Sequence, residues 1–222
     1  MCGRFAFYSP AEATAALFGV EAAPEVQPRY NIAPTQYVAA IRQGDDRERE
    51  LVMLRWGLVP FWAKDPTIGN RMINARAETV AEKPSYRAAY RHRRCLVLAD
   101  GFYEWQRVDD TKTPHYISLA SGEPFALAGL WENWKDRESD ATLQTTTLIT
   151  MAANDFMTPL HHRMPMILQA DTADEWLAGS NDLLDGISER TPRLRAWPVD
   201  RRVNNARNEG AALIDASGDI IR

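Results

Sequence analysis

Residues Phe102–Leu119 read FYEWQRVDDTKTPHYISL, and this stretch indicates the fold class. Aromatic and β-branched residues fill both of its ends, and residues 109–111 (DDT) supply a turn between them, a pattern typical of a β-hairpin over Phe102–Val108 and His115–Leu119. A second hairpin is predicted for Tyr37–Ile41 with Leu51–Trp56, joined through residues 44–46. Strands linked as hairpins run antiparallel, so we expect largely antiparallel sheets.

Shorter elements complete the predicted fold. Further strands are expected over Cys2–Phe7, Cys95–Leu98, Phe125–Trp131, Thr145–Met151 and Pro165–Leu168. Helical segments are expected from the N-cap Ser9 to Gly19, over most of Ala77–Tyr90, at Ala153–Met157, and over Thr172–Leu177 and Leu183–Ser188, with loops at Pro24–Pro34 and Gly57–Asn70. Strands outnumber helices, which predicts an α+β protein: a single domain, residues 2–222, whose curved, largely antiparallel sheets form a barrel-like core flanked by short helices.

Size and composition are those of an ordinary globular domain. The chain has 222 residues, of which 45% are hydrophobic and 25% charged. Its net charge of −4 argues mildly against a nucleic-acid partner. The basic stretch 83–94 leaves two interpretations open, a local basic groove or a solvated helix face. Two distant cysteines and no His-x-x-x-His spacing predict no metal site and no disulfide framework.

Targeting signals are missing from the sequence pattern. We find no apolar stretch of membrane-spanning length and no signal-peptide h-region. We therefore expect a cytoplasmic protein with no membrane partner. We also expect it to be a monomer.

Cys2 has the most informative position in the chain. A small residue after the start Met is accepted by methionine aminopeptidase, so we expect Met1 to be removed and the mature chain to begin at Cys2. An N-terminal Cys carries an α-amine and a thiol on adjacent carbons, and the amine has a reference pKa of about 7.7–8.0. This pair can condense with an aldehyde, first as a Schiff base and then as a thiazolidine ring. The alternative interpretation of Cys2 is a buried Cys near the terminus with no chemical role. The other cysteine, Cys95, lies within the apolar run 95–98 and is interpreted as a core residue.

Three further segments carry polar groups that core packing alone does not require. Asn74 and Arg76 could present an amide and a guanidinium to one anion, or Asn74 could cap a helix beside a surface Arg. Glu104 stands among aromatic residues, where burial would raise the pKa of its carboxyl, or it could point to solvent from an edge strand. One residue of the His161-His162 pair could act as an acid-base group, or both could be structural.

These segments together resemble the SOS-response-associated peptidase (SRAP) family. The matching motifs occur in family order from residue 2 to about residue 209 and read CGRF (2–5), YNIAP (30–34), WGLVP (56–60), NARAET (74–79), DGFYEW (100–105), HHRMP (161–165) and NARN (205–208). The resemblance implies a sensor of abasic sites in single-stranded DNA that needs no cofactor and is associated with the nucleoid when bound.

The resemblance also implies roles for individual residues. Cys2 would form the thiazolidine crosslink that shields the site from strand cleavage, assisted by the catalytic residues Asn74, Glu104 and His161. Arg4 and Arg76 would bind phosphates, and Trp62 would lie at the DNA channel. His162 replaces the Asp of many family members. Two alternatives stay open: an N-terminal-Cys peptidase or amidase, including self-removal of Met1, and a non-catalytic single-strand-binding module.

Overall fold

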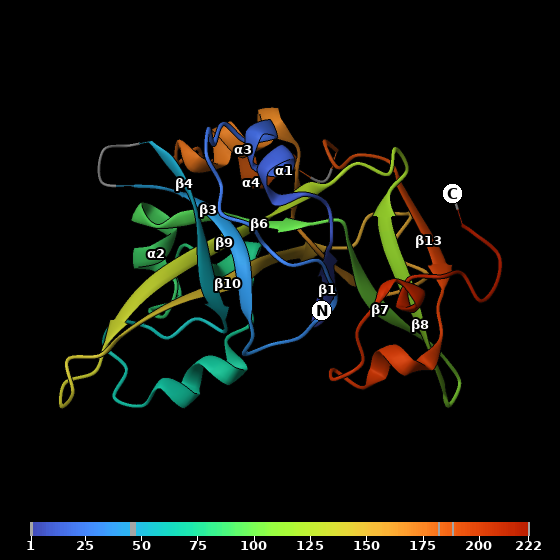
Figure 1. The fold of residues 1–222 in the computed structure, drawn as a ribbon, viewed down its shortest axis with the longest axis horizontal. Helices are drawn as coiled ribbons and strands as arrows, with labels where there is room; N and C mark the ends of the chain where they lie inside the picture. The colour runs from blue at the N-terminus through green and yellow to red at the C-terminus, as the bar shows by residue number, and fades with distance from the viewer. Residues whose placement is uncertain (1, 45–47, 182, 188, 222) are drawn as a thin grey trace.

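The computed structural model describes residues 2–44, 48–181, 183–187 and 189–221, and a closed barrel of five strands forms its larger part (Figure 1). The barrel strands are β3 (Tyr37–Gln43), β4 (Arg49–Trp56), β6 (Arg94–Ala99), β9 (Phe125–Lys135) and β10 (Thr142–Ala152). Neighbouring barrel strands are antiparallel except at the closure, where β10 pairs with β4 in parallel. Large aliphatic side chains on these strands, such as Leu54, Leu96 and Leu148, are fully buried, and each such burial stabilises the fold by about 1.5–3 kcal/mol.

A second, five-stranded antiparallel sheet stands beside the barrel (Figure 1). Its strand order is β13-β8-β7-β1-β2, and its strands are β1 (Phe5–Phe7), β2 (Arg29–Ile32), β7 (Gly101–Val108), β8 (Thr111–Leu119) and β13 (Leu194–Pro198). The chain crosses from β6 of the barrel to β7 of this sheet at Asp100, whose carboxylate accepts the backbone N–H groups of Tyr8 (2.6 Å) and Ser9 (2.8 Å). The amino-terminal strand is thereby fixed at the junction of the two sheets.

Short strands and helices cover the rest of the two sheets. The strands are β5 (Asn74–Arg76), β11 (Arg163–Pro165) and β12 (Ile167–Leu168), and the helices are α1 (Ala11–Leu17), η1 (Pro66–Arg71), η2 (Ala77–Thr79), α2 (Arg87–His92), α3 (Ala170–Leu177), α4 (Leu183–Gly186), η3 (Arg201–Asn204) and η4 (Ala211–Leu213). None of the described helices has the length and apolar character needed to cross a bilayer.

Both predicted hairpins are confirmed, and a strand forms in each further predicted segment. Most strands extend beyond the predicted ends, but Cys2–Phe7 is a strand only from Phe5, and Pro165–Leu168 is divided between β11 and β12. The α+β class with a barrel-like core is confirmed as well, because the five barrel strands close on themselves. Cys95 packs in the core as expected. The turn at residues 45–46 and Ser188, the predicted end of the last helix, lie outside the described residues.

Several local predictions are wrong, each because a tertiary contact prevails over local pattern. Pro24–Pro34 is not all loop: β2 forms there, held by pairing with β1. Ser9 does not cap α1, since it bonds to Asp100 instead. Asn74 lies in a strand beside β10 and not at a helix start. Ala77–Tyr90 holds only η2 and the first part of α2, and residues 153–157 contain no helix, with turns beginning at residue 155.

Gly101 allows the β7–β8 hairpin to pack tightly. A Cβ at this position would overlap the ring and hydroxyl of Tyr116 and the carbonyl oxygen of Ile117. We therefore expect Gly101→Ala to lower the free energy of unfolding by roughly 1–3 kcal/mol through overpacking. Urea denaturation measures this change, and Gly186→Ala is the matched control because a Cβ there meets nothing within 4 Å. Equal stability of the two variants would contradict the close packing.

Candidate functional site

Cys2 lies just before β1 and has no exposed surface in the chain that begins at Met1. Its thiol faces the backbone oxygen of Arg4 at 3.9 Å, and Asn74 Nδ2 donates to the Cys2 carbonyl oxygen at 2.8 Å. Burial, and secondly the negative charge of Glu104, raise the pKa of the thiol. The thiolate is therefore disfavoured near neutral pH until the surroundings of Cys2 change.

Asn74 is positioned by β5, which pairs in parallel with β10 so that Asn74 lies opposite Leu148. Its Nδ2 is used by the Cys2 carbonyl, whereas its Oδ1 is buried and accepts no hydrogen bond from the described residues. A buried acceptor without a donor costs about 1–3 kcal/mol, so this oxygen is suited to a donor group on a ligand. Arg76 is exposed and, two residues along the strand, emerges on the same face as Asn74.

Glu104 is buried on β7, with only 3% of its surface exposed. Strand alternation places it on the same face as Phe102, opposite the face from which Tyr103 contacts the ring of Tyr116. Burial raises the pKa of its carboxyl, and the charge of His162 partly opposes this rise. A carboxyl whose pKa is shifted toward neutrality is suited to both taking and returning a proton.

The two histidines precede β11, and their rings stack with centroids 4.4 Å apart. His161 Nδ1 lies 2.9 Å from the backbone nitrogen of Arg163 and 3.0 Å from its carbonyl oxygen. A neutral ring can accept that N–H and a protonated ring can donate to that oxygen, so Nδ1 has a partner in either state. Burial lowers the pKa of His161, and His161 itself lowers the pKa of the more exposed His162.

The loop before β11 is tied to the strand that carries Glu104. Gln106 Nε2 donates to the carbonyl oxygen of Pro159 at 3.1 Å. Gln106 lies two residues after Glu104 and therefore on the same face of β7. The loop that leads to the histidine pair is consequently linked to the strand that carries the carboxylate.

Arg4 is half-buried and is held by the protein itself. Its Nη1 donates to Asn31 Oδ1 and to the carbonyl oxygen of Val203, both at 2.7 Å, while no hydrogen bond to the described residues uses Nη2.

Trp62 is 42% exposed, next to the exposed Phe61. Among the described residues, no hydrogen bond or ring contact joins Trp62 to Cys2 or Glu104.

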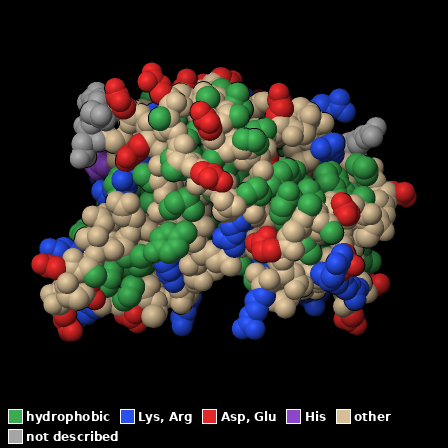
Figure 2. Space-filling model, in the orientation of Figure 1, with side chains coloured by type: hydrophobic (Ala, Val, Ile, Leu, Met, Phe, Trp, Pro, Cys, Tyr) green, Lys and Arg blue, Asp and Glu red, His purple; other side chains and the backbone are tan. Residues whose placement is uncertain are grey.

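The structure thus brings together most of the residues singled out in the sequence. Asn74 bonds to Cys2, and the charge of Glu104 affects both Cys2 and His162. Figure 2 shows an indentation at the lower edge of the molecule, between the barrel and the five-stranded sheet, with Lys and Arg side chains on both sides. Within the described part of the chain, no group of three or more His, Cys, Asp or Glu side chains could hold a metal ion.

Two contributors to the site were not identified from residue type. Asn31 falls in a segment interpreted as loop, and Gln106 has the appearance of an exposed strand residue. Of the two, only Gln106 could have been found from the sequence, because it lies two residues after Glu104 in an alternating strand and therefore shares its face. The role of Asn31 depends on a contact with residues more than 170 positions away.

Comparisons with known proteins point to one family. A family model described as SOS response associated peptidase (SRAP) matches residues 1–206. The chain is 43% identical over 229 residues to the abasic site processing protein YoaM of Bacillus subtilis, covering 99% of this chain and all of that protein. It is 32% identical to the abasic site processing protein YedK of Escherichia coli, covering 96% of this chain and 99% of that protein.

Solved structures share the fold. A protein from Bacteroides thetaiotaomicron superimposes with a TM-score of 0.85 at 24% identity, covering 97% of this chain and 100% of that one. A phage-related protein from Bordetella bronchiseptica gives a TM-score of 0.70 at 28% identity, covering 90% and 95% of the two chains.

Proposed function

Because the chain belongs to the SOS response associated peptidase (SRAP) family, we propose that it senses abasic sites in single-stranded DNA and crosslinks to them through Cys2. The observation that carries the proposal is the meeting of Cys2 with Asn74 and Glu104 at the start of β1. Relatives named abasic site processing proteins support the choice of substrate.

The crosslink forms in three steps once Met1 has been removed. The free α-amine of Cys2 adds to the aldehyde carbon of the ring-opened abasic sugar and gives a carbinolamine. Loss of water then gives an iminium ion. The Cys2 thiol adds to the iminium carbon and releases its proton, which closes a thiazolidine ring. Protein and DNA are joined with the net loss of one water molecule, and no oxidant or cofactor is consumed.

The neighbouring side chains supply the proton transfers. Glu104 accepts a proton from the Cys2 ammonium and returns it to the departing hydroxyl, for which a carboxyl with a raised pKa is suited. Asn74 Oδ1 accepts a hydrogen bond from the sugar or the reacting nitrogen. His161 transfers the proton that opens the sugar ring from Nε2, because Nδ1–H can stay bonded to the carbonyl oxygen of Arg163 in both protonation states.

Sulfur closure determines what happens to the DNA. A persisting iminium would promote β-elimination, which breaks the strand 3′ to the abasic sugar. Addition of the thiol removes the iminium and so protects the strand. The site therefore acts as a crosslinker when the thiol reaches the iminium carbon and as a lyase when it does not.

DNA is held mainly through its backbone in this proposal. The Nη2 edge of Arg4 and the exposed Arg76 bind phosphates, and the exposed Trp62 stacks on a base, a contact worth about 1–3 kcal/mol. None of these groups reads a base edge, so we expect binding that is independent of sequence.

Incubation with single-stranded DNA that carries one abasic site tests the proposal. We expect an adduct that survives denaturing electrophoresis and whose intact mass equals protein without Met1 plus DNA minus one water. Undamaged DNA of the same sequence is the control. Binding without a denaturation-resistant bond would contradict crosslinking and favour a single-strand-binding module.

A further inference from the structure

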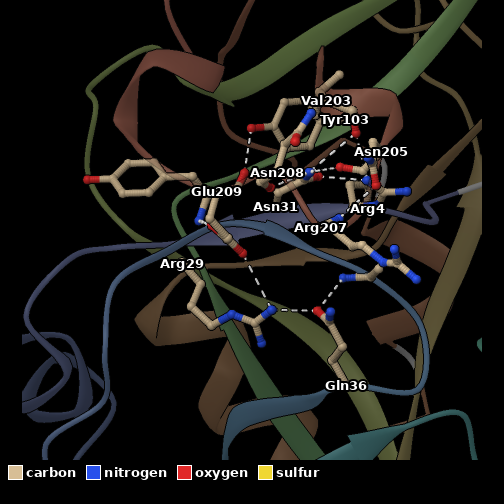
Figure 3. Close-up of polar contacts among 12 residues, drawn as sticks. Arg4, Arg29, Asn31, Gln36, Tyr103, Val203, Asn205, Arg207, Asn208 and Glu209 are labelled. Carbon is tan, nitrogen blue, oxygen red and sulfur yellow. Dashed lines mark hydrogen bonds and ion pairs between the residues drawn. The ribbon is translucent and has the colours of Figure 1, made fainter. Parts of the chain in front are cut away.

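The carboxy-terminal loop 201–209 is tied to the amino-terminal region by hydrogen bonds that meet at one buried side chain, Asn31 of β2 (Figure 3). Asn31 Nδ2 donates to three backbone carbonyl oxygens of the loop, those of Val203 (3.3 Å), Asn205 (3.0 Å) and Asn208 (2.9 Å). Arg4 Nη1 donates to Asn31 Oδ1 and to Val203. A fully buried amide is therefore devoted to holding a surface loop in one shape.

The same loop is tied to the strand that carries Glu104, from the opposite face of that strand. Trp105, which packs with Tyr103 and Val203 on that face, donates from Nε1 to Asn204 Oδ1 at 2.7 Å. At the other end of the loop, the Glu209 carboxylate accepts the backbone N–H of Tyr30 at 2.9 Å. The loop is consequently fixed beside both Arg4 and the strand that carries Glu104.

Three exposed arginines are among the side chains that this loop presents, together with exposed Asn and Glu side chains. Arg202 pairs with Asp200 at 3.3 Å. The side chains of Arg201 and Arg207 are exposed and form no ion pair or hydrogen bond with any described residue. Guanidinium groups without a protein partner can bind phosphate oxygens at no cost in broken ion pairs.

We propose that loop 201–209 is a second contact with the DNA backbone, in which Arg201 and Arg207 bind phosphates beyond the one that Arg4 binds and Asn31 is the residue that positions them. The inference rests on the proposed function for its ligand, single-stranded DNA. Phosphate contacts add affinity without reading sequence. Arg4 then serves two purposes, because its Nη1 edge holds the loop while its Nη2 edge remains for the strand.

The salt dependence of binding to undamaged single-stranded DNA tests the phosphate contacts. Each lost contact should reduce the slope of log K against log salt by about 0.7. We expect this reduction for Arg207→Ala and about twice as much for Arg201→Ala/Arg207→Ala. Arg137→Ala is the matched control: it removes an exposed arginine from the β9–β10 tip, at the opposite end of the molecule. A double variant with the wild-type slope would overturn the backbone contact.

The role of Asn31 requires a separate variant. Asn31→Asp keeps an acceptor for Arg4 but turns a carboxylate oxygen toward three carbonyl oxygens, so it should release the loop. We expect Asn31→Asp to show the same reduced slope as Arg201→Ala/Arg207→Ala, and no further reduction when Asn31→Asp is combined with that double variant. Additive reductions would overturn the positioning role. If circular dichroism shows that Asn31→Asp does not fold, Trp105→Phe, which removes the bond to Asn204, takes its place with the same expectation.

These measurements remain distinct from the test of crosslinking. Binding to undamaged DNA involves no covalent step, so its salt dependence reports the loop contact whether or not an adduct can form. If the double variant lowers the salt slope but the wild-type protein forms no adduct with abasic DNA, the proposed function is wrong and the loop contact still stands.

Discussion

Cys2→Ser protein is expected to form no adduct with abasic DNA that survives denaturing electrophoresis. The N-terminal amine of this variant still condenses with the aldehyde, but a hydroxyl is a much weaker nucleophile than a thiol and does not close the stable ring. Borohydride reduction should therefore trap a Schiff base for Cys2→Ser. The untreated wild-type adduct should persist without reductant. Electrophoresis of both proteins with and without borohydride measures the difference, and β-elimination products should accumulate for the variant.

Two controls separate the thiol from the amine and from the rest of the protein. Cys95→Ser should crosslink normally, because Cys95 is buried in the barrel and bonds to Thr146 there. A wild-type chain with one residue inserted between Met1 and Cys2 should fold but form neither adduct nor trapped imine, because its amine is displaced. Equal crosslinking by the extended chain would show that the α-amine has no role.

Cys2→Ser also distinguishes crosslinking from the peptidase alternative. An N-terminal Ser can still hydrolyse an amide slowly, so a peptidase would keep residual activity in Cys2→Ser. That residual activity would still require a free N-terminal amine. Loss of the DNA adduct together with retained peptide cleavage would show that crosslinking needs the thiol of Cys2, whereas peptide cleavage needs only a hydroxyl or thiol at that position.

The barrel strands and both hairpins could be predicted from the sequence, because their side chains repeat with the period of a strand and their ends carry turn residues. The region around the site could be predicted only in part. Glu104 stands between two aromatic residues, of which Tyr103 is buried and Trp105 partly buried, so alternation did not show which face was polar. The structure resolves this because β7 has buried side chains on both faces near Glu104.

Long-range contacts explain most of what the sequence did not reveal. β2 carries too few apolar residues to be identified as a strand, and it is stabilised by β1 on one edge and by Glu209 at Tyr30. Asn74 has the residue type of a helix cap, yet β10 pairs with it and makes it a strand residue. In both cases the deciding partner is far away in the chain, where no local pattern can indicate it.

Glu104→Gln is expected to slow crosslinking by about 10²–10⁴-fold, the usual contribution of a general acid-base group. Gln keeps the shape and the polar contacts of Glu but cannot carry a proton between the amine and the departing hydroxyl. Single-turnover rates with saturating abasic DNA measure the loss. Glu132→Gln is the matched control, because Glu132 is equally buried but pairs with Arg93 outside the site, so its crosslinking rate should stay at the wild-type value.

The same substitution should stabilise the protein in a pH-dependent way. Burial raises the folded-state pKa of Glu104 above the unfolded value of about 4.3, so ionisation favours the unfolded state. Below that value the carboxyl is protonated in both states and costs nothing, and the penalty grows as pH rises through the folded pKa. Glu104→Gln should therefore melt higher than wild type at pH 8 but not at pH 4, by about 2–4 °C for each kcal/mol removed. A variant that melts lower than wild type at pH 8 would show that the charged carboxylate is stabilised in the folded protein, and the assignment of Glu104 as a proton-transfer group with a raised pKa would have to be abandoned.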